Sequence, residues 1–304
     1  MKSSLLLIGL LLIVLTVAAT AEEKRAAVTA IAPQLVWPPP PDVPRIRWVT
    51  ELRSEVDVGA QKKRGFIDKL AGAPEEMIRL VRPIAVALDE NGVIYVGDFH
   101  LGVIAMDRTG HRMWSFSKVS GRNMPQPVGV AADSKLVYVT DSLLNTVSVF
   151  DKQGNFLAGL GSKDGINKPV GIAVDEERDL LLVVNSGEHN VLIFNRSLKL
   201  IKKVGDRGGQ EAQLNFPTYV CFIPETGFAV TDTGNFRVQI FDYNGRFIRS
   251  FGAVGDGPGA LPRRFFRGSG PFRNVSPVRL SRSFPPRSHH ALGCGLCPVS
   301  AGFI

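Results

Sequence analysis

Between residues 82 and 262 the apolar residues come in short runs of strand length, separated by polar turns. In one stretch the runs cover residues 128–132, 136–140, 146–150 and 155–160, and turns containing Asp, Lys or Gly lie between them. β-branched and aromatic residues are common in each run, and no period of 3.6 residues persists through them. The pattern predicts groups of four short strands joined by tight turns.

This group of four runs occurs four times along the chain. The prolines that open successive groups, Pro83, Pro127, Pro169 and Pro217, are 44, 42 and 48 residues apart. A four-stranded repeat of this length is typical of a β-propeller, in which each repeat forms one blade. We therefore predict an all-β fold, a β-propeller of four-stranded antiparallel blades. The blades are expected at about 82–118, 126–161, 168–205 and 216–252.

The repeats resemble a known family. Lys168–Asp175 follows the pattern Pro-x-Gly-[Ile/Val]-Ala-Val-Asp, and Asp232–Asp242 followed by Gly245–Ile248 is similar to the second half of an NHL repeat. The segment Trp37–Trp48 also resembles the start of secreted bacterial NHL-repeat proteins. Such proteins are typically six-bladed, so the resemblance implies a propeller domain over residues 45–262 with about four of an expected six blades present.

Three segments outside the repeats carry further expectations. Residues 46–51 are expected to form an isolated outer strand of the kind that completes the last blade of a propeller. Residues 66–81 are expected to contain one or two short helices, because Pro74 and the following Glu residues suit a helix start. After residue 262 the repeat breaks off, and we interpret residues 263–304 as a mostly disordered, frame-shifted or replaced tail, against the alternative of a genuine Arg-rich tail that binds an acidic partner.

The net charge of +8 does not indicate a nucleic-acid-binding protein. Residues 263–304 contain seven Arg and no acidic residue, and Lys2 is the one basic residue of the first 21. Removing these eight from the 36 basic residues leaves 28, which equals the 28 acidic residues. Because residues 22–262 have no basic excess, we expect no nucleic-acid partner.

The first residues predict export. Residues 1–21 have a positive start, an apolar core over Leu5–Val17 and small residues before Glu22, which are the features of a secretory signal peptide. Residues 22–44 include four consecutive prolines and are expected to form an extended spacer. We predict a secreted or periplasmic protein, which would contact a membrane only through an uncleaved signal anchor.

Polar residues end the second strand of each repeat. A ring of such residues could hold calcium, which prefers several oxygen ligands. The alternative, which we favour, is that each side chain accepts hydrogen bonds from nearby backbone N–H groups and fixes its own turn. The residues concerned are Asp98, Asp141, Asn185 and Asp232.

The loops that follow these residues hold the candidate binding face. In a propeller, a loop histidine with a neighbouring acid or amide could bind a metal or act as a base, although a lone loop histidine is more often solvated. Glu188, His189 and Asn190 form the densest polar group, and His100 is the other histidine of these loops. Asn235 and Arg237 match positions common to NHL repeats, and we expect them to have a structural role before a binding role.

The cysteines suggest little chemistry. Cys221 lies in an apolar run and is expected to be a small buried hydrophobe. Cys294 and Cys297 form a CxxC pair in the tail without the setting of a redox or zinc site.

Taken with the resemblance, these features imply an exported, non-catalytic scaffold that binds a protein, a glycan or a small ligand, with no cofactor evident. Two alternatives stay open. One is a metal-dependent propeller lyase or lactone hydrolase with calcium or zinc at the central mouth. The other is an inactive truncated fragment.

Overall fold

The structure, a computed structural model, describes residues 36–37, 41, 43, 46–60 and 77–255. The chain divides into two compact units, Met1–Leu52 and Arg53–Ile304. In the first unit, β1 (Val36–Trp37) pairs antiparallel with β2 (Ile46–Arg47). The strand expected within residues 46–51 is therefore shorter than predicted, and it is not isolated.

The second unit contains four four-stranded antiparallel sheets that follow one another along the chain. Blades 1 and 2 consist of β3 (Pro83–Leu88), β4 (Ile94–Asp98), β5 (Gly102–Asp107), β6 (Arg112–Phe116), β9 (Pro127–Ala132), β10 (Leu136–Asp141), β11 (Thr146–Asp151) and β12 (Phe156–Leu160). Blades 3 and 4 consist of β13 (Pro169–Asp175), β14 (Leu180–Asn185), β15 (Asn190–Phe194), β16 (Leu200–Val204), β17 (Pro217–Ile223), β18 (Gly227–Asp232), β19 (Arg237–Phe241) and β20 (Phe247–Phe251).

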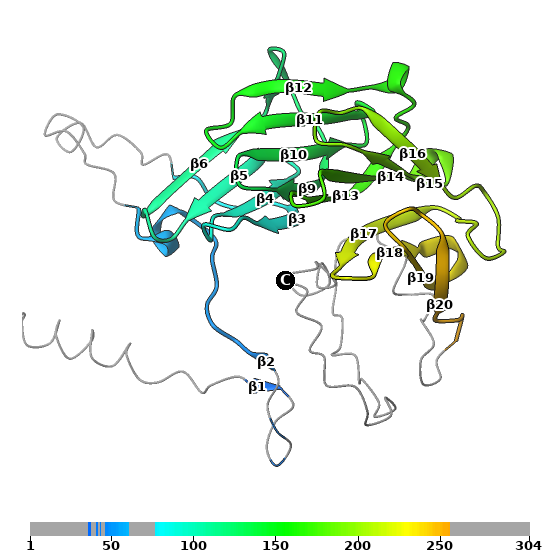
Figure 1. Cartoon of the computed structure of the whole chain (residues 1–304). Helices are drawn as coiled ribbons and strands as arrows, with labels where there is room; N and C mark the ends of the chain where they lie inside the picture. Colours follow the sequence, from blue (N-terminus) through cyan, green and yellow to red (C-terminus); the bar gives the residue numbers. More distant parts are fainter. Residues whose placement is uncertain (1–35, 38–40, 42, 44–45, 61–76, 256–304) are drawn as a thin grey trace, which may run out of the picture. The chain divides into compact units, whose positions relative to one another are not determined.

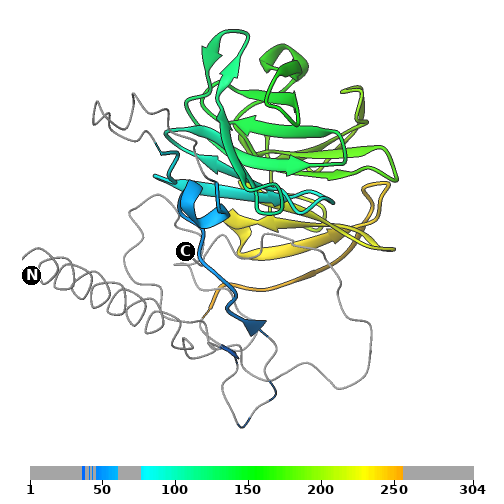
Figure 2. The same ribbon diagram turned by 90° about the vertical axis from the view of Figure 1, so that its left-hand side faces the viewer.

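The first strands of successive blades lie side by side. β3 contacts β9, β9 contacts β13, and β13 contacts β17, while the later strands of each blade extend away from this line (Figures 1 and 2). Sheets joined through their first strands in this way are the blades of a β-propeller. The prediction of an all-β propeller with several four-stranded blades is confirmed.

Burial between blades explains why the strand sequences are apolar at consecutive positions. In β14 the side chains of Leu181 and Val183 pack into the core between blades 2 and 3. Leu182 and Val184 point to the opposite face and pack into the core between blades 3 and 4. Successive side chains of a strand alternate between faces, so a sheet covered on both sides needs apolar residues at every position. We call the contact of two neighbouring blades a seam, numbered by its blades.

The remaining elements are short. They are the hairpin of β7 (Lys118–Val119) and β8 (Arg122–Asn123) and the 3₁₀ turns η1 (Glu55–Val58), η2 (Ser162–Asp164), η3 (Ser186–Glu188) and η4 (Thr233–Asn235). Within the described residues, no helix is both long enough and apolar enough to span a membrane.

Several sequence predictions concern residues that the structure describes only in part or not at all. Residues 77–81, the end of the segment expected to be helical, are not in a helix, and Arg79 forms an antiparallel bridge with Ser54. The remainder of that segment, the signal peptide and the tail lie outside the described residues. Cys221 in β17 is half-buried and disulfide-bonded, so the expectation of a small buried hydrophobe is wrong.

Candidate functional site

The residue that ends the second strand of each blade holds the adjacent turns. In blade 1, Asp98 is fully buried and accepts hydrogen bonds from the backbone N–H groups of Val81 (2.8 Å), Arg82 (2.7 Å) and His100 (2.9 Å). In blade 2, Asp141 accepts them from Gln126 at 2.9 Å and from two residues of its own loop. Both carboxylates act as turn-fixing acceptors, which is the interpretation favoured from the sequence.

Blade 3 has an amide at this position and keeps the same contact. Asn185 accepts the backbone N–H of Asn167 at 2.7 Å, and its side-chain amide donates to the carbonyl of Gly165 at 2.9 Å. The contact to the N–H ahead of the blade's proline therefore does not need a negative charge. The strand-end residue is therefore a carboxylate in blades 1, 2 and 4 and an amide in blade 3.

Asn235 and Arg237 belong to a buried network in blade 4. Arg237 pairs with the fully buried Asp232 at 2.8 Å and donates to the carbonyls of Gln210 and Gln213. Asn235 donates to Asp232 at 2.9 Å and to the carbonyl of Gly208. The guanidinium and the amide thus give the buried carboxylate hydrogen-bond donors from two side chains. These contacts hold the connection between blades 3 and 4 against blade 4.

His189 connects two blades. It caps η3 in the left-handed backbone region (φ 55°), is 7% exposed, and its Nδ1 accepts the backbone N–H of Phe216 at 3.1 Å. Its ring also lies 4.4 Å from that of Phe216. Burial and the positive charge of Arg207 lower its pKa, while Glu188 and Asp232 oppose this shift more weakly. A neutral imidazole with its proton on Nε2 fits these contacts, since Nδ1 is the acceptor.

The other predicted residues do not join His189 in one cluster. Asn190 is buried beside it and donates to the carbonyl of Glu188 at 2.9 Å, and Glu188 accepts from the side chain of Asn167 at 2.7 Å. His100, in blade 1, is exposed and has an edge-to-face contact with Phe99. Among the described residues, no group of three His, Cys, Asp or Glu side chains is arranged to hold a metal ion.

The contact made by His189 has a counterpart that the sequence reasoning missed. Asn145 occupies the same place in the loop of blade 2, also at φ 55°, and its side-chain oxygen accepts the N–H of Lys168 at 2.7 Å. Lys168 and Phe216 directly precede the first-strand prolines of blades 3 and 4. We call this hydrogen bond the upper tie. The signal in the sequence is an Asn or His four residues after the strand-end residue.

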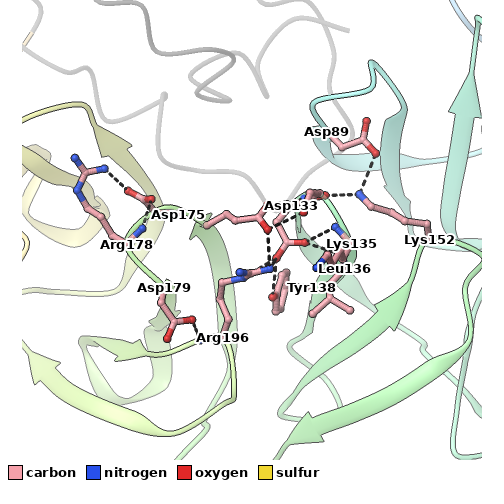
Figure 3. A network of polar contacts seen from close by, with 12 residues as sticks. Asp89, Asp133, Lys135, Leu136, Tyr138, Lys152, Asp175, Arg178, Asp179 and Arg196 are labelled. Carbon is pink, nitrogen blue, oxygen red and sulfur yellow. Dashed lines mark hydrogen bonds and ion pairs between the residues drawn. The ribbon is translucent and has the colours of Figure 1, made fainter.

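A second set of contacts crosses the 1–2 and 2–3 seams at the turn between the third and fourth strands (Figure 3). Lys152 of blade 2 reaches Asp89 of blade 1 at 2.9 Å, and Arg196 of blade 3 reaches Asp133 of blade 2 at 2.8 Å. We call these the lower clasps. Burial alone would raise the pKa of Asp133, but the hydrogen bonds from the N–H groups of Lys135 and Leu136 and from Tyr138, together with the charge of Arg196, outweigh it and lower the pKa.

The 3–4 seam replaces the ionic lower clasp with an aromatic one. Tyr243 lies at the position of Lys152 and Arg196, and the guanidinium of Arg178 stacks over its ring at 4.4 Å. Arg178 also pairs with Asp175 at 3.0 Å, so the first-strand carboxylate is still neutralised. Each seam therefore has a contact at this turn, but the residue types that make the contact differ.

Comparison with known proteins does not show a family for this chain. No protein-family model matches it. Over 57 residues it is 39% identical to the RING finger protein nhl-1 of Caenorhabditis elegans, a match that covers 19% of this chain and 6% of that protein. This chain thus corresponds to a small part of that relative, and the match supports the NHL-like repeat in a short segment only.

Solved structures resemble the chain at low identity. A streptogramin B lyase structure aligns with 12% identity and a TM-score of 0.47, covering 56% of this chain and 54% of that one. A virginiamycin B lyase from Staphylococcus aureus aligns with 11% identity and a TM-score of 0.45, covering 58% and 59%. Hydrazine synthase of Kuenenia stuttgartiensis aligns with 18% identity and a TM-score of 0.44, covering 56% and 49%. Likeness at this level says nothing about activity. The propeller fold follows from the four sheets themselves, and likeness to an NHL-repeat protein is limited to one short segment.

Proposed function

We propose that this protein is an exported, non-catalytic propeller scaffold that binds a ligand or partner. The observation that supports the non-catalytic part is the use of the loop residues. The acceptor atoms of Asp98, Asp141, Asn185, Asp232 and His189 are engaged by backbone N–H groups of the same or the next blade. A residue that must hold a turn or a neighbouring blade is poorly suited to bind a metal or to exchange protons in a reaction.

The metal content of the purified protein tests this proposal against a metal-dependent lyase or hydrolase. Elemental analysis for calcium and zinc would be made on the full chain, on His100→Ala and on His189→Asn. The last variant keeps a side-chain acceptor for the Phe216 N–H, as Asn145 does in blade 2, while it removes the imidazole. We expect less than stoichiometric metal in all three proteins. Stoichiometric metal that is lost in either variant would overturn the non-catalytic proposal.

Export is tested separately. If residues 1–21 are removed on secretion, the intact mass of the protein recovered from a bacterial periplasm corresponds to a chain that begins at Glu22. Recovery of the uncut chain from the cytosol would contradict export without affecting the scaffold proposal.

A further inference from the structure

A polar groove of about 1020 Å³ lies at the 1–2 seam, beside the lower clasp. The side chains of Tyr95, Met113 and Trp114 line it together with the polar residues Arg112, Lys152 and Gln153. All of these residues belong to one compact unit, and they come from the first two blades. A groove with aromatic and polar lining is the usual form of a small-ligand site.

The turn of blade 2 that borders the groove has a glycine where blade 3 has a bulky residue. In blade 3 the turn contains Leu198 at φ 64°, and its side chain packs against the core of the 2–3 seam. Blade 2 has Gly154 at this place, with φ 92°. A Cβ atom on Gly154 would lie 2.5 Å from Cγ of Phe116, so glycine is required there. At the 1–2 seam the ring of Phe116 therefore occupies the space beside this turn.

Trp114 is unusual for its position. It lies on the outermost strand of blade 1, paired with Ala105, and the corresponding residues of the other blades are Ala158, Lys202 and Arg249. Its indole N–H is buried and has no acceptor in the described part of the chain. A buried donor without a partner costs free energy, and an oxygen brought by a ligand, or by a water held with it, would remove that cost.

Three carboxylates line the groove, the buried Glu55 together with Asp89 and Asp107. Asp89 accepts the N–H groups of Asn91 and Val93 with one oxygen, and the hydroxyl of Tyr95 and the ammonium of Lys152 with the other. Asp107 accepts the N–H of Gly110 at 2.7 Å and the guanidinium of Arg112 at 2.9 Å. Asp89 and Asp107 therefore have donors on both oxygens.

Several hydrogen-bond donors of the groove are available to a ligand. Arg112 uses one of its N–H groups on Asp107, and its side chain is 69% exposed. The side-chain amides of Asn91 and Gln153 also line the groove, and in the described residues neither has a hydrogen bond through its amide. A site with a guanidinium, free amides and an indole N–H suits a ligand rich in oxygen acceptors that carries a carboxylate.

We infer that the groove at the 1–2 seam binds an acidic saccharide, with a carboxylate of the sugar on Arg112 and its hydroxyl oxygens on the neighbouring amides. This inference deepens the proposed function, on which it rests, because it gives the scaffold a ligand class and a place for it. It also moves the expected binding face away from the loops that hold His100 and His189.

Calorimetric titration of the full chain with a short oligogalacturonate, and with a neutral oligosaccharide of the same length, tests the inference. We expect the charged sugar to bind and the neutral one to bind at least about tenfold more weakly, since a charge-assisted hydrogen bond is lost. Arg112→Gln should weaken binding of the charged sugar by about tenfold or more, and Trp114→Phe should weaken it while it keeps most of the packing.

Arg246→Gln is the matched control. Arg246 is an exposed arginine in the corresponding turn of blade 4, away from the groove, so its replacement should leave the affinity unchanged. Thermal melts would establish that each variant folds. Equal weakening by Arg246→Gln, no binding of the charged sugar, or equal binding of an acidic peptide would each overturn the inference. Those results would leave the proposed scaffold function intact, because the metal measurement tests it independently.

Discussion

The 2–3 and 3–4 seams have the same layout and different chemistry. At the 2–3 seam the upper tie is made by Asn145 and the lower clasp by Arg196 with Asp133. At the 3–4 seam the upper tie is made by His189, and Tyr243 replaces the ionic clasp with a ring under Arg178. The comparison teaches that the repeat fixes where two blades are joined. The residue type at each contact then determines how much that contact stabilises the protein and whether this stabilisation depends on pH.

The largest expected difference concerns the lower clasp. Arg196→Met would leave Asp133, whose side chain is 1% exposed, without its cation. We expect a loss of about 2–4 kcal/mol in the free energy of unfolding, because a buried charge would lose its partner. The counterpart at the 3–4 seam is Arg178→Met, which removes a 40% exposed cation and should cost at most about 1 kcal/mol. Urea denaturation of both variants measures the difference, and equal losses would contradict it.

The next effect concerns the upper tie. His189→Ala would leave the N–H of Phe216 without its acceptor, at an expected cost of about 1–3 kcal/mol. His189→Asn should recover most of this stability, because Asn145 makes the same hydrogen bond from the same backbone conformation. If the Asn variant were as unstable as the Ala variant, stacking on Phe216 rather than the hydrogen bond would hold the blades together.

The smallest effect is a dependence on pH at one seam. The pKa of His189 is lowered from its ordinary value of 6.5, so the unfolded chain binds a proton more readily than the folded one. Stability should therefore fall as the pH drops through the unfolded value of 6.5, and level off below the lower folded pKa. The difference between the wild type and His189→Asn, measured in melts from pH 7.5 to pH 5, isolates this contribution.

The reciprocal change sharpens the comparison. Asn145→His should introduce a similar fall in stability with acid at the 2–3 seam, since the histidine would accept the Lys168 N–H only when neutral. An Asn145→His variant with unchanged pH dependence would show that the surroundings of His189, including Arg207, matter more than the tie itself.

The sequence predicts the repeat far better than the contacts between blades. Apolar runs, glycine turns and the four prolines report on local structure, which each blade forms from its own residues. The upper and lower contacts join residues of different blades: His189 meets Phe216 27 positions later, and Arg196 meets Asp133 63 positions earlier. The residues next to His189 do not distinguish a structural acceptor from a catalytic base, and the equivalent position of Asn145 in blade 2 is the one sequence signal for the acceptor. For the same reason, the groove at the 1–2 seam was not predicted, because residues far apart in the sequence line it.

The double-sided burial of β14 has a consequence for how its pairing is specified. In a strand with one solvent-exposed face, a shift by one residue would expose its apolar side chains to water, and the free-energy cost of that exposure fixes the strand's register. Leu181 to Val184 could exchange neighbours in such a shift and remain fully covered on both sides. The alignment of this strand must therefore be encoded at its polar end, where Asn185 has one set of partners and would lose them all if displaced by a single step.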